Sequence, residues 1–274
     1  MRYADTAYVV THIRYREFGI CPGVMMFFLY LAVSCICFIG GILGGMAGFG
    51  ALIIMVPALL FFMEMDVIIP LSVLCGIGTQ ALITLSFRRH IRKDSLGLLL
   101  LGSLPGIWLG SSLLLYMPEF ALRGAMGILL ISYVVWSVFG KLPPPSRPPA
   151  AIWAYVAGFF SGIFGGAFGI NGPPAVIYAT RTNWSPQEIR AFLGVFCGLL
   201  FVVTAVTMYV RGLVKQEVAI LSLAAIPCTL AGCYCGMRLT AQMQTKQYMR
   251  LIFLLLFIMG CSLCWPALRM LVMR

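Results

Sequence analysis

The sequence reads Gly40-Gly-Ile-Leu-Gly-Gly-Met-Ala-Gly-Phe-Gly50 in the middle of the apolar run 24–63. A similar stretch, Gly162-Ile-Phe-Gly-Gly-Ala-Phe-Gly-Ile-Asn-Gly-Pro-Pro174, follows 121 residues later. Glycine costs an exposed helix about 1 kcal/mol relative to alanine, so each cluster predicts an interrupted helix. Glycine-interrupted apolar segments at matching places in two halves of a membrane chain indicate a transport site.

The composition indicates a polytopic membrane protein. Of the 274 residues, 61% are hydrophobic and only 10% are charged, against roughly 25% charged in soluble domains. The net charge of +11 does not indicate nucleic-acid binding, because Lys and Arg lie between the apolar runs, where they set orientation. The expected partners are the lipid bilayer and a small anionic substrate, with no nucleic acid; a homo-oligomer is left open.

The predicted fold is all-α, with about eight transmembrane helices in two homologous four-helix repeats. At 1.5 Å per residue, the run 24–63 would form a helix of about 60 Å, twice the hydrocarbon core, so it must break. We therefore divide the chain into a cytoplasmic segment 1–23, a first repeat 24–140, a Pro-rich linker 141–150 and a second repeat 151–270. Each repeat begins with a Gly-rich broken or re-entrant segment, and the remaining spans are expected at about 67–87, 95–116, 121–140, 189–210, 217–237 and 247–268.

The internal repeat extends beyond the glycines. Cys75-Gly76 matches Cys197-Gly198, and Pro105 matches Pro227, at a shift of 122 residues. A near-constant offset over this length favours duplication of one unit.

The distribution of basic residues predicts the orientation. If each broken segment makes one net crossing, the N-terminus, 88–94, 141–149, 211–217 and the C-terminus share one side, with 13 Lys and Arg against 6 on the other. The positive-inside rule then places both termini in the cytoplasm. An even number of crossings per half predicts parallel repeats, related by an axis along the membrane normal.

The breaks are the predicted substrate site. Non-helical backbone at membrane depth is tolerated only where protein or a water-filled cavity satisfies it, and a helix start in a low dielectric favours an anion. The expected substrate-binding residues here are Gly48, Gly50, Gly169, Asn171 and Gly172. The expected helix-breaking residues are Gly44, Gly45, Gly165, Gly166, Pro173 and Pro174. The alternative is close helix packing of the small-xxx-small kind, which accounts for Gly41 with Gly45, and Gly162 with Gly166.

Further polar residues near the breaks are candidates. Tyr178 follows the second break, and Thr79 and Gln80 lie inside an apolar span. Arg190 is a candidate anion ligand, because its guanidinium matches oxyanions bidentately; otherwise it extends to the membrane interface. Ser185-Pro186-x-Glu188 favours a plain helix N-cap.

No catalytic constellation is present in the sequence. The histidines, His12 and His90, lie in basic segments, and most of the 10 cysteines lie in apolar runs, where they are expected to pack as small hydrophobes. We predict no enzymatic activity, no cofactor and no metal site.

The two glycine-rich stretches resemble the two repeats of the sulfite exporter TauE/SafE family. The second, extended to Tyr178 and followed by Trp184-Ser-Pro-Gln-Glu-Ile-Arg190, is the more specific match, and the resemblance covers about residues 25–270. It implies a bacterial inner-membrane permease for small sulfur-containing or carboxylate anions, such as sulfite or sulfoacetate. The first stretch has Ala51 where many members have another glycine.

The predicted function is a secondary transporter for a small anion, with its site between the two breaks and alternating access to it. Two alternatives stay open. One is a membrane-embedded thiol or redox factor that uses Cys75 and Cys197, which occupy equivalent repeat positions. The other is an anion channel, which would give uncoupled flux that does not saturate.

Overall fold

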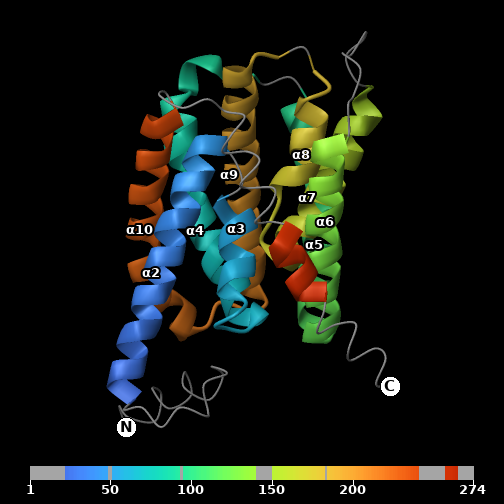
Figure 1. Ribbon diagram of the computed structural model, residues 1–274. Coiled ribbons are helices and arrows are strands. Elements are labelled where there is room, and N and C mark those ends of the chain that lie inside the picture. Colours follow the sequence, from blue (N-terminus) through green and yellow to red (C-terminus); the bar gives the residue numbers. More distant parts are fainter. Residues whose placement is uncertain are drawn as a thin grey trace.

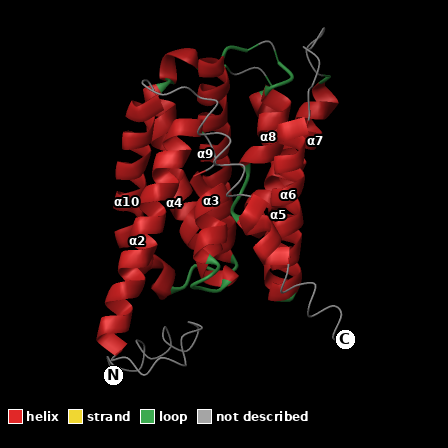
Figure 2. Cartoon of the chain, viewed as in Figure 1, coloured by secondary structure: helices red, strands yellow, loops and turns green. Residues whose placement is uncertain are grey.

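The computed structural model describes residues 22–48, 51–92, 95–139, 150–182, 184–240 and 257–264. This part of the chain is helical and contains no strand, as Figure 2 shows. Seven helices are long and apolar enough to cross a membrane, so the expected polytopic all-α class is confirmed. The eighth expected span, 247–268, lies largely outside the described residues. The elements in chain order are α2 (Pro22–Ala47), α3 (Ala51–Leu59), α4 (Met65–Ser86), η1 (Arg88–His90), α5 (Leu96–Tyr116), α6 (Glu119–Phe139), α7 (Ala151–Phe168), α8 (Gly172–Ala179), α9 (Pro186–Val210) and α10 (Gln216–Thr240).

The helices break where the two glycine clusters end. Gly48 follows α2 with φ +80°, and Gly169 follows α7 with φ +68°. Both are in the left-handed region, which glycine adopts at the residue after a helix. The amide of Gly48 donates to the carbonyl of Gly44, and that of Gly169 to the carbonyl of Gly165. These bonds satisfy carbonyls that the ends of α2 and α7 would otherwise leave exposed.

The prediction that the earlier glycines break the helices is wrong. Gly44 and Gly45 lie inside α2, and Gly165 and Gly166 lie inside α7. These glycines are needed for close packing: a Cβ at Gly45 would collide with the carbonyl of Cys233 in α10, and one at Gly166 would lie 2.7 Å from the carbonyl of Ile107 in α5. The small-xxx-small alternative is therefore correct for Gly45 and Gly166.

Two ion pairs overturn the predicted topology. Arg92, before α5, pairs with Glu188 in the first turn of α9 (N–O 3.4 Å), although the prediction placed 88–94 and 181–190 on opposite sides. Lys215, before α10, pairs with Asp66 in the first turn of α4 (2.7 Å), and these were also expected on opposite sides. We name the two ends of the bundle the Arg92 end and the Asp66 end after these pairs.

Each broken segment consists of a helix long enough to span and a short helix that turns back, so the segment makes no net crossing. Gly44 of α2 lies against Ala51, and Gly40 lies against Met55, so α3 runs antiparallel to α2 and returns toward the Asp66 end. Its nine residues span only about 13 Å, less than half of the hydrocarbon core. In the second half α8 turns back on α7 in the same way, as Figure 1 shows.

The two halves therefore run in opposite directions, which contradicts the expected parallel arrangement. Helix α2 packs parallel to α10, because Gly41 lies against Thr229 and Gly45 lies one turn further along, against Cys233. Since α10 starts directly after Lys215, α2 starts at the Asp66 end. Helix α7 packs parallel to α5, because Gly158 lies against Leu99 and Gly162 against Ser103, so α7 starts at the Arg92 end.

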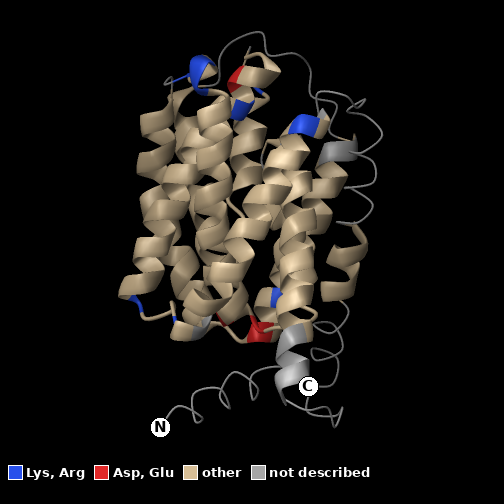
Figure 3. Cartoon of the chain, turned by 90° about the vertical axis from the view of Figure 1, so that its left-hand side faces the viewer, with Lys and Arg blue, Asp and Glu red and all other residues tan. Residues whose placement is uncertain are grey.

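The charged side chains gather at the two ends of the bundle. Figure 3 shows Lys, Arg, Asp and Glu of the described residues at the top and bottom, with an uncharged band between them. Large apolar side chains are exposed along the outside, among them Trp108, Ile128, Leu223 and Val206. This pattern is that of a protein whose middle is covered by lipid.

Candidate functional site

A small cavity lies where the two breaks approach each other. Its volume is about 10 Å³, about the space that one water molecule needs. Four parts of the chain line it: the start of α3, the break before α8, the middle of α4 and the middle of α9. The lining residues are Ala51, Leu52, Ile53, Thr79, Gln80, Gly169, Ile170, Asn171, Gly172, Cys197 and Phe201.

Two helices begin at this cavity, one from each half of the chain. Ala51 is the first residue of α3 and Gly172 is the first residue of α8, and both line the cavity. The first amides of a helix have no partner within it, and together they carry roughly +0.5 of an elementary charge. Pro173 and Pro174 follow Gly172 within the first turn, where no amide partner is required. They carry no N–H themselves, so α8 offers fewer free amides at its start than α3 does. Both prolines, which were expected at the break, thus lie just after it, in the first turn of α8.

Asn171 is the buried polar residue of the second break. Its side chain is 3% exposed and lines the cavity. The side-chain amide donates to the carbonyl of Cys197 in α9 (3.3 Å), and it makes no capping hydrogen bond to α8. This hydrogen bond fixes the break against α9.

Two neighbouring polar residues of α4 face the same space. The Thr79 hydroxyl donates to the carbonyl of Gly76 within its own helix (3.1 Å). Gln80 is 6% exposed, and its Oε1 atom has no hydrogen-bond partner among the described residues. A buried polar atom without a partner is unusual and costs stability, unless a ligand or water satisfies it.

Several predicted ligands lie outside the cavity. Arg190 donates to the carbonyl of Met46 at the end of α2 (3.1 Å), where a cation stabilises the helix C-terminus. A Cβ at Gly48 would lie 2.7 Å from the Arg190 side chain, so these two residues meet near the Arg92 end. Tyr178 is buried in α8 but does not line the cavity. Gly50 lies outside the described residues.

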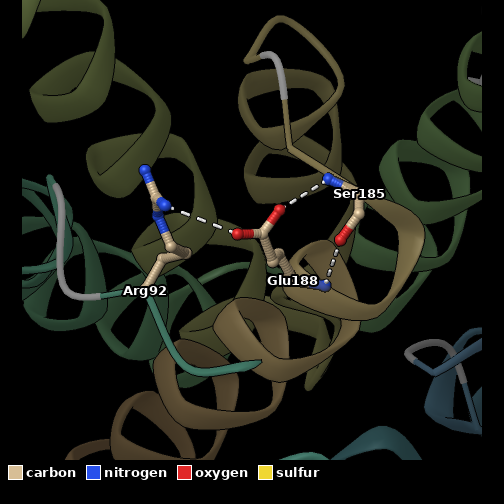
Figure 4. Close-up of polar contacts among 3 residues, drawn as sticks. All are labelled: Arg92, Ser185 and Glu188. Atoms are coloured by element: carbon tan, nitrogen blue, oxygen red, sulfur yellow. Dashed lines mark hydrogen bonds and ion pairs between the residues drawn. The ribbon is translucent and has the colours of Figure 1, made fainter. Parts of the chain in front are cut away.

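The segment before α9 has the predicted N-cap. Figure 4 shows that the Ser185 hydroxyl accepts a hydrogen bond from the Glu188 amide, and that the Glu188 carboxylate accepts one from the Ser185 amide. Arg92 contacts the same carboxylate. This reciprocal arrangement satisfies two amides at the helix start and fixes the beginning of α9, which supplies Cys197 and Phe201 to the cavity.

Four cysteines of the described residues, Cys37, Cys75, Cys197 and Cys233, are buried in the helix packing, whereas Cys35, Cys235 and Cys261 are exposed. Cys75 and Cys197 are both fully buried free cysteines, and only Cys197 of the two lines the cavity. Cys264 packs against α6, with its sulfur 3.9 Å from the carbonyl of Gly124. Within the described residues, no group of three or more His, Cys, Asp and Glu side chains is arranged to hold a metal ion.

Comparison with known protein families matches residues 33–263 to sulfite exporter TauE/SafE. The chain belongs to the sulfite exporter TauE/SafE family. No curated protein and no solved structure matches it. The family match includes both breaks and every residue that lines the cavity, and it makes the protein a membrane transporter of the sulfite-exporter type.

For this TauE/SafE transporter, sequence reasoning found part of the cavity. Gly169, Asn171 and Gly172 were predicted, and Thr79 and Gln80 were named as candidates because they are polar residues inside an apolar span. The apolar walls Leu52, Ile53 and Phe201 were missed. No sequence signal separates them from the many apolar side chains that face lipid or other helices.

Proposed function

We propose that this TauE/SafE protein is a permease that moves a small anion across a bacterial inner membrane by alternating access. The anion is a sulfur oxyanion, a sulfonate such as sulfoacetate, or a carboxylate. The observation that carries the proposal is the cavity between the two breaks, where two helix starts from different halves of the chain meet. Helix starts favour an anion.

The opposite directions of the two halves support alternating access. Inverted repeats, related by an axis in the membrane plane, are a common basis of this mechanism, with the substrate at the repeat interface near the midplane. We therefore replace the expected parallel repeats by two inverted repeats, α2–α6 and α7 to the C-terminal helix. Because each half can adopt the conformation of the other, one fold provides an outward-open and an inward-open state.

The basic residues support one orientation. At the Arg92 end lie Arg88, Arg89, Arg92, Arg181, Arg190 and Arg238, and at the Asp66 end lie Arg123, Arg211 and Lys215. The positive-inside rule favours the Arg92 end as cytoplasmic. In that orientation α2 begins at the opposite surface, so the 88–94 loop and the start of the first span do not share a side.

The direct test is transport by the purified protein in proteoliposomes. Uptake and efflux are measured for radiolabelled sulfite, thiosulfate, sulfoacetate, taurine and a dicarboxylate, with protein-free liposomes as the control. A permease gives saturable flux that unlabelled substrate on the far side accelerates. Flux that rises without saturation indicates a channel, and no flux of any of these anions contradicts the proposal.

A sulfur-relay role for the cysteines is tested in the same assay. Cys197 lines the cavity and Cys75 lies at the equivalent place in the first half. We expect the Cys75→Ser, Cys197→Ser double variant to transport, because neither thiol is needed to bind an anion at helix starts. Loss of flux with a normal melting temperature would favour the thiol mechanism.

A further inference from the structure

We infer that the cavity between the breaks binds a Na⁺ ion through oxygen atoms of Gln80 and of residues 169–171, and that this ion is transported together with the anion. Residues 169–171 are the non-helical backbone between α7 and α8. The inference rests on the proposed function and specifies its coupling ion.

The first argument is the oxygen atom of Gln80. This residue lies on α4, lines the cavity and is 6% exposed. Its Oε1 atom accepts no hydrogen bond from the described residues. A buried acceptor without a donor is costly, and it can be satisfied only by an N–H group, an O–H group or a cation. The atom therefore indicates a positively polarised ligand in the cavity.

The second argument is the backbone of the break before α8. At the starts of α4 and α9 the preceding residue, Glu64 or Ser185, accepts a hydrogen bond from an amide within the helix. Residues 169–171 line the cavity, and their carbonyls accept no such bond among the described residues. Pro173 and Pro174 account for this difference, because they have no N–H to donate. The break thus supplies carbonyl oxygens that remain available to a ligand.

The chemistry of the lining favours Na⁺ among the possible cations. No Asp, Glu, His, Lys or Arg is among the described residues that line the cavity. A bound proton would need a basic side chain, and Ca²⁺ or Mg²⁺ would need carboxylates. Neutral oxygens of unwound backbone at the C-terminal end of a helix, such as α7, are typical ligands of Na⁺ in transporters. The volume of about 10 Å³ holds one water molecule, and Na⁺ is smaller than water.

The same cavity brings this cation close to the transported anion. Ala51, the first residue of α3, also lines it, and a helix start favours an anion. Opposite charges attract strongly in a low dielectric, and a bound pair avoids the cost of burying one charge alone. Na⁺ should therefore raise the affinity for the anion, and the anion should raise the affinity for Na⁺ by the same factor. Because both ions move together, the direction of transport follows the sum of their two gradients.

The first experiment measures binding without transport. The melting temperature of the purified full-length protein in detergent is titrated with NaCl, while choline chloride keeps the total chloride constant. We expect a saturable rise, because a ligand that binds the folded state stabilises it, and KCl should need concentrations about ten-fold higher or more. Adding sulfite should lower the Na⁺ concentration that gives the half-maximal rise. A melting temperature that is the same in NaCl and in choline chloride overturns the inference.

Substitutions at Gln80 test the ligand itself. Gln80→Met keeps the length of the side chain but removes the amide oxygen, and should raise the half-maximal Na⁺ concentration about ten-fold or more. Gln80→Glu keeps oxygen atoms at this position and should retain the response to Na⁺, which a role in packing alone would not explain. Thr229→Val is the matched control, since this buried hydroxyl of α10 donates to the carbonyl of Ala225 (2.6 Å) and does not line the cavity. A wild-type response of Gln80→Met contradicts the inference.

The second experiment measures transport and separates this inference from the proposed function. In proteoliposomes, replacing Na⁺ by choline should lower uptake of radiolabelled sulfite about ten-fold or more, and sulfite should accelerate uptake of radiolabelled Na⁺. If sulfite flux is equal in choline, the Na⁺ site is wrong while the permease stands. If Na⁺ stabilises the protein but no anion is transported, the permease and the joint transport are wrong. If taurine, and not Na⁺, gives a rise in melting temperature that Gln80→Met removes, the oxygens bind the ammonium group of a substrate and the inference is wrong.

Discussion

At the scale of single residues, a substitution at Asn171 tests whether the second break binds substrate. We predict that Asn171→Leu abolishes anion flux, because it replaces a cavity-lining amide with an apolar group. The variant also loses the hydrogen bond to Cys197, so we expect a cost in folding stability of about 1 kcal/mol. Flux and melting temperature, measured on the same preparation, report the loss of transport and the loss of stability separately. Wild-type flux would contradict a ligand role.

Arg190→Met is the matched control for this measurement. It removes a polar side chain that lies close to the other break but outside the cavity. We expect a stability loss of about 1 kcal/mol from the end of α2 and an unchanged KM. A raised KM in this variant would indicate that Arg190 contacts the substrate.

At the scale of helices, two glycines one turn apart in α7 have different functions. Gly162 faces α5, where a Cβ would collide with the carbonyl of Ser103, whereas a Cβ at Gly165 would lie 3.2 Å from the Cβ of Asn171. We predict that Gly162→Ala destabilises the α5–α7 contact by several kcal/mol, because backbone cannot move aside as a side chain can. Gly165→Ala should fold but reduce flux by displacing Asn171.

Expression level, melting temperature and flux distinguish these two variants. The expected pattern is low yield of folded protein for Gly162→Ala and folded protein with reduced flux for Gly165→Ala. Gly97→Ala is the control, since no atom lies within 4 Å of a Cβ there and alanine favours a helix. Equal behaviour of the Gly162 and Gly165 variants would contradict the separate roles.

The glycines also show how far the sequence determines these helices. Their clustering predicted two breaks, and both exist. It did not predict the break positions, because glycine serves both close packing and a left-handed φ, and only the neighbours distinguish the two. Gly45 and Gly48 look alike in sequence, yet one packs against Cys233 and the other ends α2. In the cavity the same limit applies to Phe201, since apolar side chains carry no positional signal.

At the scale of the whole molecule, the topology is open to a direct measurement. His90 and Gln216 are both exposed, and they lie at the Arg92 end and the Asp66 end respectively. In a cysteine-depleted protein in intact cells, we predict that an impermeant maleimide labels Gln216→Cys and not His90→Cys. The reverse pattern would invert the proposed orientation, and equal labelling of both would contradict the opposite placement of these ends.

The sequence did not provide this topology, for a physical reason. Charge counting assumes a number of crossings, and the glycine clusters permit either a crossing or a return. The choice depends on whether α3 packs back on α2, which in turn depends on the contact of Gly44 with Ala51. That contact exists only in the folded structure and leaves no signal in the sequence. The count of 13 Lys and Arg residues against 6 therefore assumed a chain path that the structure does not have.

The two end pairs occupy equivalent positions in the two halves. Asp66 corresponds to Glu188 at a shift of 122 residues, and Arg92 corresponds to Lys215 at a shift of 123. Each pair joins the first turn of α4 or α9 to the loop before the helix α10 or α5 of the other half. As half-exposed ion pairs they contribute little to stability. Their matched placement at opposite ends suits contacts that close the two sides of the cavity in turn.

The last prediction concerns these two pairs as alternating contacts. In a cysteine-depleted protein, Arg92→Cys with Glu188→Cys, or Asp66→Cys with Lys215→Cys, is linked by a flexible bismaleimide. We expect either link alone to stop steady-state flux, because alternating access requires each end to open once in every cycle. Before linking, both variants should transport.

Glu119→Cys with Arg123→Cys is the control, since this pair lies within one helix at the Asp66 end and its link should not affect flux. If a fully linked pair between the halves transports at the unlinked rate, that end does not open during transport, and the proposed exchange between the two halves is wrong.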